Sequence, residues 1–481
     1  MKNQLNRRSI LKTGTAALIG AAAQPFIGIP ALAAYAVGPT VRRNAFTMAT
    51  GDPIFVGYRK AITAMRALPT NDPCSWTYQA AIHGTTLLPV QTAWNTCHTN
   101  ANFFWSWHRM YLYWFERIVR KHSGMYDWAL PYWDWANPAQ RQLPPAFRVV
   151  GSALYDASRI AAMNSGAGMV SLALGTAVTT AYTNLNFFLA QSAINGPHGS
   201  IHGAVNGNMC CVQSAAQDPI FWAHHSNVDR QWNLWLAQGG GRTNPLSDAA
   251  WKNTVFTFFD ECCREVRMTA CEILRAAKQL SYKYEEEPPQ VEQFCPIIWN
   301  PGPILIAEVA RFPRPFWLTK QPVAFSIAED SDNKGLGARL AELARTPGQT
   351  AVLQLKGVEA KMHPGASWEV YVGPAGLQPN PQSPHFVGVL GMFAGGLPKA
   401  DHYHTGEFVY PIDRAVSASS DPSKLQVLFV PVSGIEVDGR AVPPDVRADV
   451  LVPQISIVVD AAMPQPPPEE QEQLRRAEEM K

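Results

Sequence analysis

The sequence predicts a mainly α fold class, in which a helical bundle at residues 34–300 is followed by a small β-sandwich at 301–460. Two observations support this division. Apolar side chains recur at helical spacing up to about residue 285. Beyond that point, short runs rich in β-branched and aromatic residues alternate with glycine and proline. The proline-rich stretch at 285–303 is typical of a linker.

Four helical segments are predicted in the first domain. Apolar positions follow a helical period over 52–68, and Pro69 ends that run. A second run begins at His108, and two more pass through 198–202 and 224–235. An aromatic loop is expected at 131–138, where the sequence is PYWDWANP.

The second domain contains six predicted strands, at 323–328, 351–358, 368–372, 407–411, 425–432 and 455–459. Their short length and the glycine and proline between them favour a β-sandwich. Residues 461–481 are rich in proline and then charged, which predicts a disordered tail.

The composition is that of a globular protein with a large interior, because 47% of the 481 residues are hydrophobic and 15 are tryptophan. A chain of this length usually divides into two domains. Forty basic and 38 acidic side chains leave a net charge of +2, with no basic block. Nucleic acid is therefore not expected as a partner.

The first 33 residues predict an export signal. Arg7 and Arg8 precede a weakly hydrophobic stretch at 13–34, and 31–33 offers small residues for a signal peptidase. This pattern is typical of a twin-arginine signal, so we expect passage through the twin-arginine export machinery and a periplasmic or secreted protein. The alternative is a membrane anchor, but Pro25 and Pro30 make the stretch a poor transmembrane helix.

Eight cysteines are few for a disulfide framework in a chain of this length. We expect neither vicinal pair, Cys210-Cys211 or Cys262-Cys263, to bridge easily within itself. Pairing of Cys262 or Cys263 with Cys271 or Cys295 is an alternative in an oxidising compartment.

Histidines form two clusters, which are His83, His98 and His108, and then His198, His202 and His225 with His224 beside it. His198 and His202 are four residues apart, so on a helix they project from one face and can hold one ion. Asn227 and Asp229 follow His225, where they can orient imidazoles or anchor Arg230.

Imidazole binds copper in both oxidation states and leaves coordination positions open for O2. Three nitrogens per ion without a thiolate argue against structural zinc and blue copper. A single histidine pair is more often a surface or packing feature. Two clusters beside aromatic runs instead predict two copper ions per chain, facing each other inside the bundle.

Several segments resemble the tyrosinase and polyphenol oxidase family, which includes the catechol oxidases. The similar segments are WSWHRMYLYWFERIVRK at 105–121, ALPYWDWANP at 129–138 and DPIFWAHHSNVDRQWNLW at 218–235. PHGSIHG at 197–203 is similar to the second copper site of plant catechol oxidases. AVLQLKGVEA and SWEVYVG resemble the terminal β-domain of the plant enzymes.

The resemblance implies a type-3 dicopper centre, with copper A on His83, His98 and His108 and copper B on His198, His202 and His225. It also implies that Phe221 packs against a copper B ligand and the substrate. The implied reaction oxidises o-diphenols to o-quinones and reduces O2 to water. In similar proteins the terminal domain covers the copper entrance, and here a loop with Met392 and Phe393 would supply the covering side chain.

The chain departs from the family pattern around copper A. His98 lies ten residues before His108 instead of nine, and Thr99 takes the usual position. Cys97 lies beside His98, whereas relatives with a Cys–His thioether have one residue between the two. We therefore expect a free, buried Cys97 in preference to a thioether.

Around copper B, relatives that hydroxylate monophenols carry a glutamate. The corresponding region here holds Ile194, with Gln191, Ser192 and Asn195 nearby, and none is acidic. Gly199 and Gly203 add no side chain that could bind a water, and Val212 replaces a bulky gate residue, so an open substrate pocket is expected. Diphenol oxidation is thus favoured over hydroxylation.

Three alternatives to a catechol oxidase are a tyrosinase with both activities, an oxygen carrier similar to haemocyanin, and an o-aminophenol oxidase. O2 and small phenols are the expected partners. His402 and His404 form an exposed His-x-His motif that could hold copper during loading, although a plain surface loop is the stronger expectation.

Overall fold

The structure is a computed structural model that describes residues 39–97, 101–296, 307–393 and 404–479. Three predicted features lie outside these residues: the export signal at 1–33, the ligand His98 with its neighbour Thr99, and His402. The side chain of His404 is also not described. The described residues belong to one unit, Gly38–Lys481.

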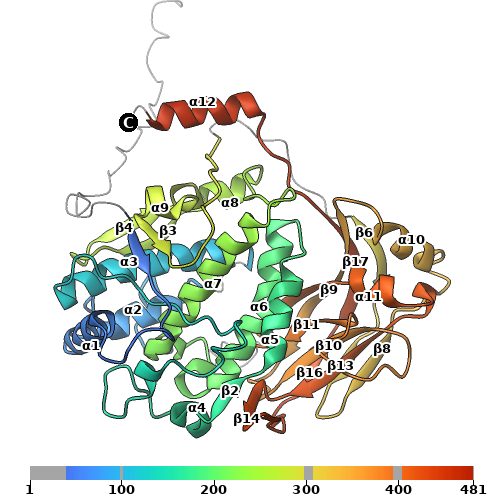
Figure 1. The fold of residues 1–481 in the computed structure, drawn as a ribbon, viewed down its shortest axis with the longest axis horizontal. Helices are drawn as coiled ribbons and strands as arrows, with labels where there is room; N and C mark the ends of the chain where they lie inside the picture. Colours follow the sequence, from blue (N-terminus) through green and yellow to red (C-terminus); the bar gives the residue numbers. More distant parts are fainter. Residues whose placement is uncertain (1–38, 98–100, 297–306, 394–403, 480–481) are drawn as a thin grey trace, which may run out of the picture. The chain divides into compact units, whose positions relative to one another are not determined.

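Helices are the main regular structure of the described chain up to about residue 255. They are α1 (Pro53–Arg66), α2 (Trp76–His83), α3 (Phe104–Ser123), α4 (Ala161–Ser165), α5 (Leu172–Ala181), α6 (Phe187–Val205), α7 (Pro219–Ala237) and α8 (Ala249–Asn253), and α9 (Ala276–Gln279) follows later. Helix α3 packs against α1 and α7, and α5 packs against α6 (Figure 1). The four predicted helices are confirmed as α1, α3, α6 and α7. In the part of the chain that is described, no helix is long and apolar enough to cross a membrane.

Short polar side chains determine where the histidine-bearing helices begin. Asp218 caps α7 and Asn186 caps α6, each through a side-chain oxygen that accepts backbone N–H bonds. Pro219 occupies the first position of α7, where a helix needs no N–H donor. Ser75 caps α2, which ends at His83. The local sequence therefore fixes the start of each of these helices.

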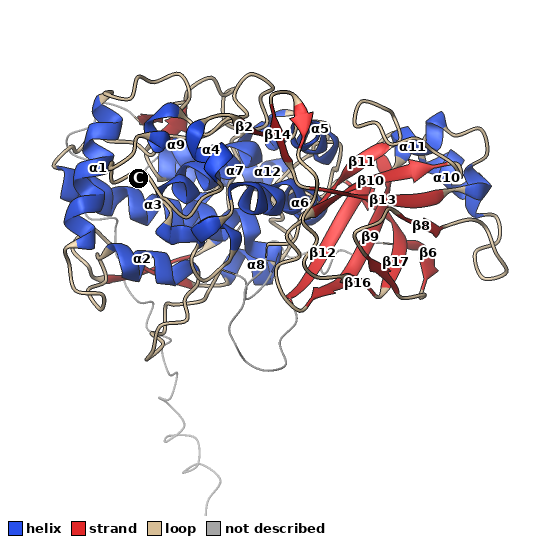
Figure 2. Cartoon of the chain, turned by 90° about the horizontal axis from the view of Figure 1, so that it is seen from below, coloured by secondary structure: helices blue, strands red, loops and turns tan. Residues whose placement is uncertain are grey.

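The C-terminal part contains two antiparallel sheets. The first has the order β11-β10-β13-β8 and the second β6-β17-β9-β16-β7, with β12 also paired to β9. The strands are β6 (Glu308–Phe312), β7 (Phe316–Leu318), β8 (Val323–Ser326), β9 (Gln349–Ala360), β10 (Ser367–Gly373), β11 (Phe386–Leu390), β12 (His404–Pro411), β13 (Gln426–Val432), β16 (Val450–Val452) and β17 (Gln454–Ala461). Val370 and Phe429 of the first sheet share one buried core with Leu353 and Ile457 of the second. The helical core and the β-rich C-terminal part are thus confirmed (Figure 2).

The prediction of a mainly α chain holds only in part, because strands occupy more of the chain than expected. Within the helical part, β3 (Phe256–Phe259) pairs with β4 (Glu265–Met268), and β5 (Tyr282–Tyr284) pairs with β1 (Thr40–Arg42). Two short helices, α10 (Leu336–Leu343) and α11 (Asp413–Ala418), accompany the C-terminal sheets.

The prediction of a disordered tail is wrong over α12 (Pro468–Glu479). Glu469 and Glu470 lie in its first turn, where negative charge favours a helix. Glu472 accepts hydrogen bonds from Arg475 and Arg476 at helical spacing. The charge composition that indicated disorder therefore supports a helix here.

A strand of the C-terminal part also belongs to a sheet of the helical part. Strand β14 (Ile435–Val437) pairs with β2 (Gly168–Val170) and with β15 (Arg440–Ala441). Arg141 and Glu436 form an ion pair of 2.8 Å beside this pairing. The two parts are therefore joined by backbone hydrogen bonds.

Helix α6 packs closely against the C-terminal part because two of its residues are glycines. A Cβ atom on Gly196 would lie 2.1 Å from the carbonyl oxygen of Val389, and one on Gly199 would lie 2.3 Å from that of Gly391. Asp460 accepts backbone N–H bonds of 2.6 and 2.9 Å from the residues just before α6. The helix that carries His198 and His202 is thus covered by the C-terminal part.

The disulfide predictions need correction. Cys210 and Cys211 do form a bridge, Cys263 pairs with Cys74, and Cys271 pairs with Cys295. Cys97 and Cys262 are free. Cys74 and Cys263 are 189 residues apart and meet where the β3–β4 turn approaches the start of α2, a contact that sequence spacing cannot reveal.

Candidate metal centre

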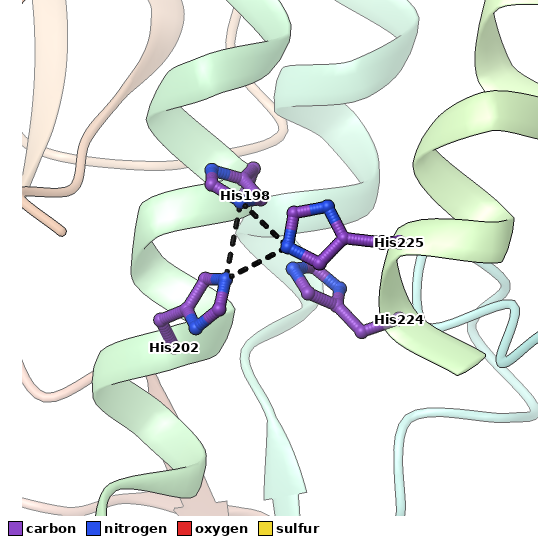
Figure 3. Close-up of side chains that lie close together, drawn as sticks. All are labelled: His198, His202, His224 and His225. Atoms are coloured by element: carbon purple, nitrogen blue, oxygen red, sulfur yellow. Dashed lines mark hydrogen bonds between the residues drawn. The ribbon is translucent and has the colours of Figure 1, made fainter. Parts of the chain in front are cut away.

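Three histidine nitrogens converge where α6 faces α7 (Figure 3). The Nε2 atoms of His198 and His202 are 3.1 Å apart, and the Nε2 atom of His225 lies 3.4 and 3.3 Å from them. All three side chains are fully buried. The structure therefore brings together the three residues predicted for copper B.

The other cluster lies against the first. His83 comes from the end of α2 and His108 from α3, and ligand atoms of these two and of His225 lie within 4.8 Å of one another. The rings of His108 and His225 are stacked, with centroids 4.1 Å apart. His98 lies outside the described residues, so its role stays a prediction.

Hydrogen bonds at Nδ1 orient four of these rings. Each Nδ1 atom faces a carbonyl oxygen, which can only accept, so Nδ1 carries the proton and Nε2 keeps a lone pair directed inward. The pairs are His83 with Val212 at 3.0 Å, His108 with Phe104 at 2.7 Å, His202 with Met209 at 2.8 Å and His198 with the Asn195 side chain at 3.1 Å. Nothing in the sequence pattern indicated the two loop carbonyls, Met209 and Val212.

Burial keeps the imidazoles neutral. Burial first, and then neighbouring histidines, lower the pKa of His202 and of His225 well below the ordinary range. Neutral rings with Nδ1 protonated point lone pairs at one another across 3.1 Å, as between His198 and His202. A cation between the nitrogens would relieve this repulsion, and nitrogen donors of this kind suit copper. The residues present therefore fit the predicted metal.

His224 is a fourth histidine at this position. Its ring stacks on His198 at 5.2 Å, and it belongs to the same group of convergent ligand atoms (Figure 3). Burial and then His108 lower its pKa to about 3. The His224-His225 doublet was the sequence signal for this residue, although spacing alone favoured His225.

Phe221 packs between the two clusters. Its ring lies 4.2 Å from His225 and 4.7 Å from His83, and the side chain is fully buried. The predicted contact of Phe221 with a copper B histidine is therefore present.

The three residues predicted to leave the pocket open are instead packed against other segments of the chain. Val212 contributes its carbonyl to His83 and packs on Gly84. Gly199 lies against Gly391, and a Cβ on Gly203 would lie 3.5 Å from His363. In this conformation both glycines face the C-terminal part, which can pack closely on α6 because neither glycine has a side chain.

Phe393 occupies the space in front of the histidines. Its ring stacks on His202 with centroids 3.7 Å apart and an interplanar angle of 21°. It also lies 5.6 Å from His198 and 5.8 Å from His83. The expected covering side chain of the loop at Met392 and Phe393 is therefore in contact with both clusters.

Asn227 and Asp229 were predicted to orient imidazoles or anchor Arg230, and only Asn227 contacts Arg230. Arg230 pairs with Asp134 at 3.2 Å and with Asn227 at 3.4 Å. The carboxylate of Asp229 binds Arg109 at 2.5 Å and Arg42 at 3.2 Å. Burial raises the pKa of Asp229, but the two guanidinium groups outweigh it and hold that pKa below the ordinary range.

Cys97 is a free, buried thiol, as predicted. Its Sγ atom lies 3.4 Å from Nε2 of His108, and burial raises the thiol pKa well above the ordinary range. A thiol held protonated in this way is a weak nucleophile.

Two family models match this chain. Residues 73–159 and 156–238 match the common central domain of tyrosinase, and residues 245–293 match the polyphenol oxidase middle domain. Tyrosinase HcTyr1 of Hahella sp. (strain CCB-MM4) is 31% identical over 303 residues, which are 50% of this chain and 62% of that protein. The latent, chloroplastic polyphenol oxidase of Prunus armeniaca is 33% identical over 281 residues, which are 49% of this chain and 47% of that protein. The chain thus spans about half to three-fifths of the length of these curated relatives.

Solved structures share the fold. Latent aurone synthase has a TM-score of 0.65 at 21% identity and covers 90% of this chain and 91% of its own. Latent apple tyrosinase has a TM-score of 0.62 at 22% identity and covers 88% of this chain and 98% of its own. At this identity the likeness concerns the fold. Residues 73–238 are thus similar to the common central domain of tyrosinase, and residues 245–293 to the polyphenol oxidase middle domain.

Proposed function

We propose that this protein is a copper-dependent oxidase of o-diphenols. Two catechol molecules would be oxidised to two o-quinones while one O2 is reduced to two molecules of water. The observation that carries the proposal is the convergence of the His198, His202 and His225 nitrogens opposite His83 and His108. Bound copper would supply O2 binding and the transfer of electrons from the phenol.

The protein side chains would hold two ions in fixed positions. His83, His98 and His108 would bind copper A, and His198, His202 and His225 would bind copper B. Their neutral rings and inward lone pairs suit this role. Phe221 would form the apolar wall against which a phenol ring packs.

The side chains that precede His198 favour diphenols over monophenols. Asn195 is occupied by the His198 ring, and Gln191 accepts a bond from the backbone of Trp105. Neither side chain can accept a proton from a phenol, because amides are not bases at neutral pH. A catechol needs less help, since its hydroxyl groups are more acidic.

Tyrosinase activity is the second candidate, because relatives that this chain resembles bear that name. Hydroxylation of monophenols would then require a base from another segment. A haemocyanin-like oxygen carrier would bind O2 but not consume it with catechol.

We further infer that the C-terminal part keeps the enzyme latent. Phe393 stacks on His202, and Gly391 just before it packs closely on Gly199. A phenol cannot occupy the space that this ring fills. We also propose export through the twin-arginine machinery to the periplasm or the medium, on the basis of Arg7 and Arg8.

The test uses the copper-loaded full-length protein, with copper measured by elemental analysis and O2 uptake by electrode. We expect about two copper ions per chain, fast turnover of dihydroxyphenylalanine after the cover is displaced, and slow or lagging turnover of tyrosine. Equal rates on both substrates would favour the tyrosinase alternative. Zinc, or a single copper that persists after reconstitution, would refute the dicopper proposal.

A further inference from the structure

The disulfide between Cys210 and Cys211 lies between two backbone groups that orient histidines. The residue before the bridge, Met209, accepts the Nδ1 proton of His202 at 2.8 Å through its carbonyl oxygen. The residue after it, Val212, accepts that of His83 at 3.0 Å. Within the four residues 209–212, the chain thus holds one histidine of each cluster.

The backbone changes direction at this bridge. A 3₁₀ helix covers Gly207–Cys210, and Cys211 is extended, with φ of −133° and ψ of 136°. The two carbonyls consequently point to rings that come from different helices, α6 and α2. Any rotation about the bonds of the Cys210–Cys211 segment would move one carbonyl relative to the other.

The other contacts of this loop fix its ends. Asn208 binds the side chain of Asp156 at 2.7 Å, and its N–H donates to Ser158 at 3.0 Å. Ser214 donates to the carbonyl of Asn208 at 2.7 Å. A disulfide between adjacent residues closes a small covalent ring around the peptide that joins them, so it restricts the rotations that those end contacts leave open.

We propose that the Cys210–Cys211 disulfide is a positioning element. It fixes the orientation of the Met209 and Val212 carbonyls, which in turn orient the rings of His202 and His83. The inference rests on the proposed function, since these rings are assigned to copper B and copper A. Groups that orient a metal-binding imidazole strengthen metal affinity. Because one disulfide fixes the orientation of two such groups, breaking it would weaken metal binding at both ion sites.

The experiment compares the C210A/C211A double variant with C271A/C295A in the full-length, copper-loaded protein. The control removes a bridge whose cysteines lie outside the histidine clusters. Copper release into excess chelator at pH 7 and the thermal unfolding midpoint of each apo-protein are measured. We expect C210A/C211A to release copper about tenfold faster than the wild type, at the lower end of the range for the loss of an orienting group. The rate of copper release from the C271A/C295A control should stay within about twofold of that of the wild type, because distant sites influence one another weakly.

Equal release rates in the two variants would overturn the inference, as would alkylation of both cysteines in the denatured, unreduced wild type. If C210A/C211A does not fold, the bridges of the wild type are titrated with a phosphine reductant and quantified by differential alkylation. Copper release must then follow reduction of Cys210–Cys211 and not that of Cys271–Cys295. A wild type that binds no copper would instead contradict the proposed function itself.

Discussion

Replacement of Phe393 by alanine should activate the intact protein. The ring covers His202 and contacts both histidine clusters, and Gly391, two residues earlier, packs on Gly199. The substitution therefore removes the side chain that fills the site and leaves the docking of the C-terminal part in place.

The magnitude follows from the contacts of this one ring. Full burial of a phenylalanine contributes about 1.5–3 kcal/mol, and Phe393 is partly exposed, so only part of that applies. Stacking on an aromatic ring adds about 0.5–1.5 kcal/mol. Burial and stacking together favour the state in which Phe393 covers the histidines by about 2 kcal/mol. This corresponds to roughly a 30-fold bias against substrate entry.

The assay is the initial rate of catechol oxidation at low substrate, with the copper content determined on the same sample. We expect kcat/KM of Phe393→Ala to rise about 10- to 30-fold at an unchanged copper content. Phe316→Ala is the matched control, because this ring packs on Phe325 at 4.7 Å within the β-sandwich. An unchanged rate in a fully loaded Phe393→Ala protein would show that the ring does not limit access.

Three further predictions follow from buried groups. His202→Ala should leave about one copper per chain and abolish catechol oxidation, because the two remaining nitrogens hold the ion poorly. The control is His385→Ala, which removes a ring bonded to Val372 and should keep two coppers and the activity. Asp229→Asn should lower the free energy of unfolding in urea by about 3–5 kcal/mol, since Arg42 and Arg109 lose a buried partner. The exposed pair of Glu265 and Arg267 is its control, and Glu265→Gln should cost less than about 1 kcal/mol. Burial raises the pKa of Asp460 to about 7, so ionisation of this carboxyl opposes folding. The stability of the wild type relative to Asp460→Asn should therefore fall as the pH rises from about 4 to 7. A stability difference that does not change with pH would contradict this last assignment.

The sequence predicts local features of the site well. The i, i+4 spacing of His198 and His202 and the helical run after Asp218 depend on nearby residues, and the structure has both. The contact of Phe221 with His225 is equally local, because one turn of α7 separates them.

Partners that come from distant segments could not be predicted. Asp229 is adjacent to Arg230 in the chain, yet it binds Arg42 and Arg109, since consecutive side chains leave a helix in directions about 100° apart. Cys74 likewise pairs with Cys263 only because the fold brings two loops together. Spacing along the chain carries no information on such contacts.

Two further sequence predictions also failed. The charged tail from Pro468 forms a helix because its acidic and basic residues are ordered along the chain in a way that overall composition ignores. The Cys210–Cys211 pair forms a bridge although adjacent cysteines are an unusual pairing.

The pairing of β14 with β2 has a consequence for maturation by proteases. A single cut after Cys295 in the linker before β6 would sever the covalent connection, whereas a cut before Cys295 would leave the Cys271–Cys295 bridge across it. The cut after Cys295 would still leave β14 hydrogen-bonded to β2 and Glu436 paired with Arg141. Beyond β17 the chain returns to the helical part, where Gln465 binds Thr243. The nicked protein would therefore behave as a two-chain complex that purifies as one species, and release of the cover would require a second event that separates the chains.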